Sequence, residues 1–249
     1  MSPIPASSSA AAVRLIVDPV LAVVFPSRCP ACAGHVARPT LGPLCEACWR
    51  DLPRHMGRLC ACGFPLRGGA LDACGRCRRG LASFARGFSL GPYAGALRVA
   101  LHELKYRGRR RVAARLAEAV LSDARSASLL TPGAVLVAVP LHPRRQRERG
   151  FNQADLLAEE LARRAHLRVA GAALVRRIDT PSQTGLTAAA RRANMAGAFA
   201  VRRRAQVAGR VVVLVDDVLT TGATARACAR VLLQAGAMEI RLLTAARVD

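Results

Sequence analysis

Two adjacent carboxylates, Asp216 and Asp217, directly follow a run of five apolar residues at positions 211–215. Four of these five residues are β-branched, which predicts a fully buried parallel strand. Open parallel sheets bind their ligands beyond the carboxyl ends of the strands. Ionised acids rarely stand side by side at a strand end without a hydroxyl or cation partner, so the pair predicts a ligand. The alternative is a buried strand whose acids lie at the turn by chance.

A short segment rich in hydroxyl groups links the acid pair to the next predicted helix. It comprises Thr220, Thr221, Gly222, Ala223 and Thr224, and the helix has apolar residues at 225, 228, 231, 232 and 235. Free N–H groups and the positive end of the helix dipole at such a turn bind phosphate. Acids beside a phosphate-binding turn predict a sugar phosphate, with the carboxylates accepting from ribose hydroxyls or holding Mg²⁺ through water.

The segment 211–224 resembles the 5-phosphoribosyl-1-pyrophosphate (PRPP) motif of type I phosphoribosyltransferases. In that family two acids bind the ribose hydroxyls and the following loop binds the 5′-phosphate. The resemblance therefore implies ribose binding by Asp216 and Asp217 and phosphate binding by residues 220–224, with Mg²⁺ accompanying PRPP. Purine-salvage members of the wider superfamily carry a carboxylate where this chain has Thr220, which argues against ordinary purine salvage.

Arginines are concentrated between a predicted strand over 134–139 and the predicted helix that Asn152 caps. They are Arg144, Arg145, Arg147 and Arg149. Because loops at the carboxyl edge of a parallel sheet converge on one crevice, we expect this loop to lie near Asp216. Planar guanidinium groups bind phosphates in bidentate fashion, so the loop predicts a pyrophosphate contact, with a merely solvated loop as the alternative.

Eight of the nine cysteines lie between residues 29 and 77 in two sets. The first set is Cys29, Cys32, Cys45 and Cys48, and the second set is Cys60, Cys62, Cys74 and Cys77. Two Cys-x2-Cys pairs separated by 12 residues, as in the first set, are typical of a tetrahedral structural zinc site. We therefore expect one or two structural Zn²⁺ ions, with the first site the more regular.

The first pair of the second set is one residue shorter than a Cys-x2-Cys pair. This leaves open a distorted site, a lost site, or His55 in place of Cys60. A disulfide framework is the alternative for both sets, and it requires an oxidising compartment. Cys228 stands apart on the apolar face of the last predicted long helix, and we expect it in the core.

The chain carries a formal charge of +22, and Lys105 is its only lysine. Residues 1–80 hold 10 arginines and 4 acids, whereas residues 81–249 hold 28 basic and 12 acidic residues. The surplus in the second part is concentrated at 107–111, 144–149 and 202–204. Such a surplus is typical of a polyanion partner, whether PRPP, DNA or RNA. Aromatic residues make up only 4%, which argues against a long base-stacking surface.

Composition divides the chain into three segments. Residues 1–12 are expected to be disordered, residues 13–80 to form a short helix and a double zinc ribbon, and residues 81–249 to form a phosphoribosyltransferase-like domain. The apolar stretch 13–25 is too short to span a bilayer and lacks the basic start and cleavage site of a signal peptide. We therefore expect a short helix packed on the body, no membrane span and a cytoplasmic protein.

Strands and helices alternate through the second part of the chain, which predicts an α/β fold with a parallel sheet and right-handed crossovers. The predicted strands of this sheet lie near residues 135, 174, 211 and 239. A strand over 84–93 and helices over 95–107 and 111–125 precede them. The polar, glycine-containing stretch after the strand near 174 predicts a mobile lid over 182–192.

Four features together are similar to the ComF family of competence-associated phosphoribosyltransferase-like proteins. They are the double zinc ribbon, Arg149-Gly150-Phe151-Asn152-Gln153, Ser182-Gln183-Thr184 with Arg191 and Asn194, and the PRPP motif. The resemblance spans about 13–249 and implies a type I phosphoribosyltransferase-like parallel sheet flanked by helices, with an N-terminal double zinc ribbon. It also implies handling of single-stranded DNA during natural transformation, with a competence helicase or DNA-processing factors as partners.

Several functions are consistent with these residues. As an enzyme, the chain would transfer a phosphoribosyl group from PRPP to a nitrogen nucleophile, and we favour this function. Its catalytic residues would be Asp216, Asp217, Arg149 and Arg191. The alternatives are a non-catalytic, PRPP-sensing factor that binds nucleic acid, and a salvage enzyme for an unidentified base. The sequence shows no general base for the acceptor, and a purely structural zinc-ribbon adaptor would leave the PRPP motif unexplained.

Overall fold

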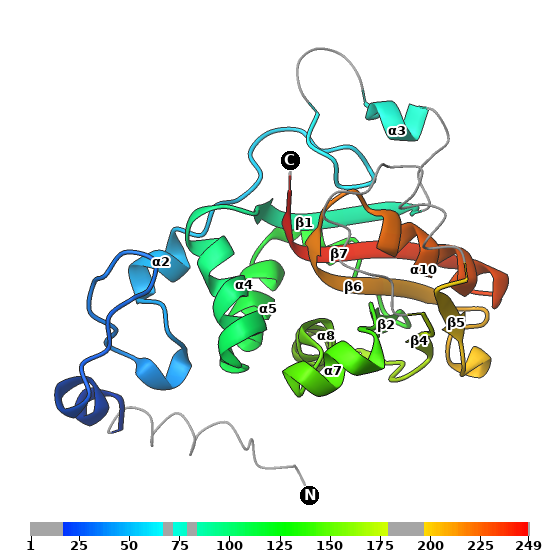
Figure 1. Cartoon of the computed structure of the whole chain (residues 1–249). Coiled ribbons are helices and arrows are strands. Elements are labelled where there is room, and N and C mark those ends of the chain that lie inside the picture. The colour runs from blue at the N-terminus through cyan, green and yellow to red at the C-terminus, as the bar shows by residue number, and fades with distance from the viewer. Residues whose placement is uncertain (1–16, 67–71, 79–83, 179–196, 249) are drawn as a thin grey trace, which may run out of the picture.

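The computed structural model describes residues 17–66, 72–78, 84–178 and 197–248, and Figure 1 shows their arrangement. Five parallel strands form the central sheet in the order β1-β7-β6-β2-β3. Their bounds are β1 Arg86–Pro92, β2 Val135–Ala138, β3 Arg168–Val169, β6 Val211–Leu219 and β7 Glu239–Arg247. The predicted parallel sheet is confirmed, and its long inner strands β6 and β7 are apolar because both of their faces are covered.

Helices cover both faces of the sheet (Figure 1). One face is covered by α4 Gly95–Arg107, α5 Arg111–Leu121 and α8 Gln153–Ala165, and the other by α10 Ala223–Gln234. Alternation along β6 directs Val213 and Val215 into the first core and Val212 and Leu214 into the second. Any later residue of β6 therefore faces either the α4 side or the α10 side according to its position.

The strand predicted near residue 174 does not join the parallel sheet. It is β4 Leu174–Arg176, which pairs antiparallel with β5 Phe199–Val201 in a separate two-stranded sheet. The outermost parallel strand, β3, is only two residues long, so it offers little edge on which a further parallel strand could pair. The prediction of a parallel strand at this position was therefore wrong.

The helix predicted over 111–125 ends earlier, at Leu121. Asp123 accepts a hydrogen bond from the backbone N–H of Arg125 and caps a separate short helix, α6 Ala124–Ala127. A carboxylate at this position favours a new helix start over continuation of the old helix. The other predicted helix of this region, over 95–107, coincides with α4.

The direction of chain progression reverses between β2 and β6. From β2 the chain passes through α8 on one face to β3, and from β6 it passes through α10 on the other face to β7. Doubly wound sheets bind ligands at such a reversal point, which here lies at the carboxyl ends of β2 and β6. β2 pairs with β6 only as far as Ala138 opposite Val215, whereas β7 follows β6 to Leu219.

The N-terminal segment covers the outer edge of β1. It contains η1 Pro39–Leu41, α2 Glu46–Arg50 and α3 Gly75–Arg78. The backbone N–H of His55 donates to the carbonyl of Leu90 at 3.1 Å, and that of Gly87 donates to the carbonyl of Ala61 at 2.7 Å. An otherwise exposed strand edge is thereby paired, which protects it from pairing with other chains.

Residues 17–24 form the described part of the helix predicted near the N-terminus. Asp18 fixes it to η1 of the N-terminal segment by accepting hydrogen bonds from the backbone N–H and the hydroxyl of Thr40, both at 2.9 Å. The packing is one-sided, because Val23 and Phe25 remain 81% and 68% exposed. Within the described part of the chain, we find no helix with the length and apolar character needed to span a bilayer.

Candidate functional site

The acid pair lies at the reversal point between β2 and β6, although within β6 and not directly after it as the sequence suggested. β6 continues through both acids to Leu219, because β7 pairs with it along this whole length. On the other side, the last bond to the β2 segment is donated by the N–H of Val139 to the carbonyl of Val215. Asp216 and Asp217 therefore border the point where β6 loses one of its neighbours.

The two carboxylates face opposite sides of the sheet. Asp217 is 4% exposed on the α4 side, where its Oδ2 lies 2.6 Å from Nζ of Lys105. Asp216 lies on the α10 side, near Cys228 of that helix. The pKa of the Cys228 thiol is raised, first by its own burial and then by the negative charge of Asp216. Burial, followed by the charge of Asp217, raises the pKa of Asp216 well above its ordinary value. A cation or hydroxyl donors at this edge would therefore stabilise the ionised form of Asp216.

Backbone N–H groups hold both carboxylates in place. Asp216 Oδ1 accepts from the N–H of Asp217 at 2.9 Å, and Asp217 Oδ1 accepts from the N–H of Val218 at 2.8 Å. Because Lys105 contacts the second oxygen of Asp217, both oxygens of this carboxylate are already engaged. Any ligand of Asp217 must share the carboxylate with Lys105 or displace it.

The predicted phosphate-binding turn connects β6 with α10. Gly222 is the N-cap of α10 and has a φ of 72°, a conformation that favours glycine. The hydroxyl of Thr221 accepts from the N–H of Ala223 at 3.4 Å, and the carbonyl of Thr221 accepts from the guanidinium of Arg226 at 2.9 Å. The turn therefore places the positive end of a 12-residue helix, together with a cation, next to the acid pair.

The arginine-rich stretch is a helix, α7 Pro143–Arg149, and not the predicted loop. Pro143 presets the first helical turn, and the His142 side chain caps the helix by accepting from the N–H of Arg144 at 3.3 Å. Gly150 ends it with a φ of 77°. The residues between them are good helix formers, which explains why the segment is helical. Asn152 caps the following helix, α8, as predicted.

Helical geometry separates the four arginines of α7. Arg144 pairs with Glu148 at 2.9 Å, whereas Arg149 donates to Oε1 of Gln153 at 2.5 Å and stacks over the ring of Tyr106. A cavity of about 410 Å³ lies between α7 and the end of α4. It is lined by Lys105, Tyr106, Gly108, Arg145, Glu148, Arg149 and Phe151. Arg145 and Arg149 therefore border the same cavity as Lys105, and Arg144 and Arg147 do not line it.

Lys105 is the residue of this site that sequence analysis did not assign. It is in the last turn of α4, next to the buried Leu104 and four residues after the buried Leu101. A usable signal was present, because the chain's only lysine lies beside the apolar face of a predicted helix. Burial alone would lower the pKa of Lys105, but the charge of Asp217 outweighs it and raises the pKa.

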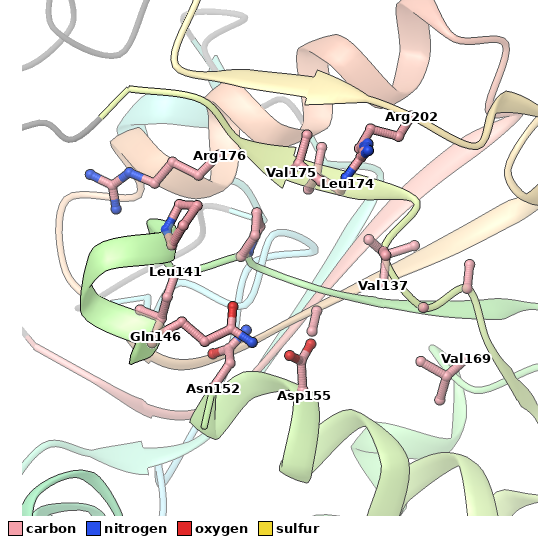
Figure 2. A pocket seen from close by; sticks show the side chains of 16 residues that line it. Val137, Leu141, Gln146, Asn152, Asp155, Val169, Leu174, Val175, Arg176 and Arg202 are labelled. Atoms are coloured by element: carbon pink, nitrogen blue, oxygen red, sulfur yellow. The ribbon is translucent and has the colours of Figure 1, made fainter. Parts of the chain in front are cut away.

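A second cavity, of about 270 Å³, lies between the start of α8, α7 and β4 (Figure 2). Its mostly apolar wall carries polar groups from Gln146, Asn152, Asp155, Arg176 and Arg202. Among the described residues that line it, Asp155 is the only one with a carboxyl group, and burial raises the pKa of Asp155. Neither Asp216 nor Asp217 lines this cavity, so it is separate from the acid pair. The predicted lid over 182–192, including Arg191, lies outside the described residues.

Both cysteine sets converge into tetrads. In each set the four Sγ atoms lie within 4.8 Å of one another. The Sγ separations of Cys32–Cys45 and Cys62–Cys74 are 3.6 Å, close to the edge of about 3.8 Å of a tetrahedron with Zn–S bonds of about 2.3 Å. Four thiols in such a tetrad fit Zn²⁺, and the shortened Cys60–Cys62 pair does not prevent convergence. The second tetrad includes Cys60, so His55 does not replace it.

The cysteines show no sign of the alternative disulfide framework. All nine belong to the described residues, and all nine are free thiols. Cys228 is fully buried in the core beneath α10, as predicted. The structure therefore assigns eight cysteines to two candidate zinc sites and one to packing.

Comparisons with known proteins agree with this geometry. A double zinc ribbon domain model matches residues 20–78, and a phosphoribosyl transferase domain model matches residues 152–248. The chain is 35% identical to the DNA utilization protein YhgH of Escherichia coli O157:H7 over 219 residues, covering 86% of this chain and 92% of the relative. It is 32% identical to Competence protein F of Haemophilus influenzae over 231 residues, covering 90% and 98%. It is 30% identical to Competence protein ComFC of Bacillus subtilis over 203 residues, covering 78% and 79%.

Proposed function

The chain belongs to the ComF family of double-zinc-ribbon proteins with a phosphoribosyltransferase domain, and we propose that it binds PRPP with Mg²⁺ at the carboxyl ends of β2 and β6 and acts as a phosphoribosyltransferase. The observation that carries this proposal is the position of Asp216 and Asp217 at the reversal point of the sheet, directly before the N-terminus of α10. A structural acid pair would not require an adjacent helix N-terminus that favours a phosphate.

Each part of PRPP has a chemically matched partner at this edge. The 5′-phosphate would bind at the turn 220–224, where N–H groups and the dipole of α10 favour an anion. The ribose hydroxyls would donate to the carboxylates of Asp216 and Asp217. The diphosphate would bind in the cationic cavity to which α7 contributes Arg145 and Arg149.

The chain's own residues would act chiefly by positioning and charge. During transfer, the bond from C1 of ribose to the pyrophosphate oxygen breaks and its electron pair leaves with pyrophosphate. The lone pair of the acceptor nitrogen forms the new bond to C1, and the proton of that nitrogen passes to solvent water. The carboxylates near the ribose stabilise the positive charge that develops on the sugar, and the arginines of α7 stabilise the departing pyrophosphate. Bound Mg²⁺ would supply further neutralisation of the diphosphate. Arg191, which lies outside the described residues, stays a proposed catalytic residue.

A second proposal concerns nucleic acid. A groove of about 550 Å³ lies between the first cysteine tetrad and the turn from α4 to α5. Four arginines contribute to its wall, namely Arg28, Arg109, Arg110 and Arg111. Guanidinium groups along one groove suit the phosphates of single-stranded DNA, and such binding should weaken steeply with salt. Gly108 lines both this groove and the cavity beside α7, so DNA bound in the groove would approach the diphosphate position.

Turnover of PRPP tests the first proposal. We expect pyrophosphate release from PRPP·Mg²⁺ in the presence of single-stranded DNA or of one member of a panel of nitrogen bases. Calorimetry should show PRPP binding that is lost in the double variant Asp216→Asn/Asp217→Asn. The matched control is Glu159→Gln, which removes one exposed carboxylate from α8. Unchanged affinity in the double variant would reject the site, and binding without turnover would select the non-catalytic PRPP-sensing factor.

A reduced, cytoplasmic environment suits this proposal. Thiolate zinc ligands persist where disulfides are not formed, and all eight tetrad cysteines are free thiols.

Fluorescence anisotropy with a labelled oligonucleotide, measured across a salt series with and without PRPP·Mg²⁺, tests the nucleic-acid proposal. We expect affinity that falls as salt rises and partial competition by PRPP. Absence of binding at low salt would reject it.

A further inference from the structure

Lys105 connects two parts of the proposed site, Asp217 and the cavity beside α7, that would bind different parts of PRPP. Its Nζ lies 2.6 Å from Oδ2 of Asp217, and the two side chains are only 17% and 5% exposed. Its side chain also lines the cavity that Arg145 and Arg149 border. One flexible ammonium group therefore lies between the carboxylate proposed for ribose and the arginines proposed for diphosphate.

The ion pair is unlike an ordinary surface salt bridge. Removing two charges from water is costly, and a pair of this kind contributes little net stability compared with apolar side chains of similar volume. Asp217 has its other oxygen engaged by the N–H of Val218, so its carboxylate is fully positioned when Lys105 is in place. A site that needed Asp217 only for folding would gain nothing from leaving Lys105 open to a cationic cavity.

We propose that Lys105 is a positioning residue that couples ribose binding at Asp217 to diphosphate binding in the cavity beside α7. This inference rests on the proposed function and goes beyond it. In the ligand-free protein the ammonium of Lys105 neutralises Asp217. When ribose hydroxyls donate to Asp217 in its place, the ammonium turns on its four-carbon stem toward the diphosphate.

The movement of Lys105 from Asp217 to the diphosphate is favourable because neither the starting state nor the final state leaves a buried charge without a partner. Asp217 keeps a donor or cation partner throughout, so no buried carboxylate is left unpaired. Lys105 moves toward the diphosphate, which carries more negative charge than Asp217. The diphosphate also separates Lys105 from the repulsion of Arg145 and Arg149 in the same cavity. Coupling between two sites is reciprocal, so each ligand must raise the affinity of the other by the same factor.

Two fragments of PRPP make this coupling measurable. Ribose 5-phosphate probes the Asp217 side, and inorganic pyrophosphate probes the cavity. Calorimetry on the full, zinc-loaded chain with Mg²⁺ should show that saturating pyrophosphate raises ribose 5-phosphate affinity about tenfold, within the usual range of coupling. In Lys105→Gln we expect the coupling factor to fall to about one and pyrophosphate to bind more weakly. Lys105→Arg, which keeps the charge, should retain part of the coupling.

The matched control is Arg98→Gln, which removes one positive charge from the exposed side of the same helix. It should leave the coupling factor at its wild-type value. If Lys105→Gln also retains that value, the inference is wrong. Failure of the wild-type chain to bind PRPP·Mg²⁺ at all would instead reject the proposed function.

A further variant keeps the inference testable if Lys105→Gln does not fold. Asp217→Asn removes the partner of Lys105 and leaves the ammonium available to the cavity. We expect this variant to bind pyrophosphate at least as tightly as the wild type while losing the coupling. Weaker pyrophosphate binding in Asp217→Asn would show that the pair has only a structural role.

Discussion

The two cysteine tetrads contain the same four thiols but attach to the body of the protein in different ways. The apolar residues around the first tetrad, including Val36, Leu44 and Trp49, belong to the same hydrophobic core as α4 and α5. Among the described residues, the two apolar cores include Cys29 of the first tetrad and no cysteine of the second. The first tetrad is therefore part of the folded core, and the second is attached to its surface.

Side chains dock the first tetrad, whereas backbone groups, together with the Phe64–Arg247 contact, dock the second. Arg115 of α5 pairs with Glu46 at 2.9 Å and lies over the ring of Trp49. Near the second tetrad, the carbonyl of Ala61 accepts from the N–H of Gly87 on β1. In Figure 1, α2 lies next to α4 and α5, whereas α3 lies beyond β1. The two tetrads share the same set of ligands, but the first stabilises the main core and the second covers the edge of β1. Loss of the first site should therefore destabilise the protein more than loss of the second.

Cys45→Ser should have the largest effect. Structural zinc sites have apparent binding free energies of about 10–16 kcal/mol, comparable to the whole stability of a domain, about 5–15 kcal/mol. Because the first tetrad shares the main core, its loss should abolish the cooperative unfolding transition. Circular dichroism melting and elemental analysis test this prediction. A variant that loses one zinc but melts like the wild type would show that the first tetrad is not part of the core.

Cys62→Ser should have a smaller effect. We expect about two zinc ions in the wild-type chain and about one in this variant, with the sheet still folded. A lowering of Tm by roughly 5–10 °C would correspond to a few kcal/mol for a chain of this size. Equal loss of structure in Cys62→Ser and Cys45→Ser would contradict the comparison. Two zinc ions retained in Cys62→Ser would remove Cys62 from the ligand set.

Features carried by local sequence were predictable. Four valines before Asp216 specified a buried strand, and spacing specified the first cysteine tetrad. The shortened Cys60–Cys62 pair left the second tetrad open, and the structure shows that it converges. The signals for α7 were also present, because Pro143 and Gly150 mark its two ends. They were outweighed by the expectation that arginines before a parallel-sheet helix form a loop.

Features that depend on long-range contacts were not predictable in this way. The ion pair of Lys105 with Asp217 joins α4 to β6, and no local pattern specifies such a partner. The antiparallel pairing of β4 with β5 depends on how little edge β3 offers. Side-chain direction at the acid pair depends on the register of β6 with β7, which continues past the end of β2.

Gly87→Ala should partly detach the second tetrad from β1. A Cβ atom at Gly87 would lie 2.3 Å from the carbonyl oxygen of Cys62, which is a backbone atom that cannot rotate away. Overpacking of this kind costs about 1–3 kcal/mol. The matched control is Gly171→Ala, where a Cβ would meet no atom within 4 Å. Urea unfolding midpoints measure the difference, and equal midpoints for both variants would contradict close docking at β1.

Phe64→Leu should have the smallest effect, and it tests whether the second tetrad reaches the proposed PRPP site. The guanidinium of Arg247 lies 3.9 Å from the centre of the Phe64 ring, and Arg247 is 4% exposed. Arg247 pairs in register with Leu219, the residue before the phosphate-binding turn. Leucine keeps an apolar side chain but removes a cation–π contact of about 0.5–2 kcal/mol. We expect two zinc ions, a Tm lowered by a few degrees and PRPP affinity weakened about two- to threefold, because the end of β7 would hold Leu219 less firmly. Unchanged PRPP affinity with a lowered Tm would confine the second tetrad to a stabilising role.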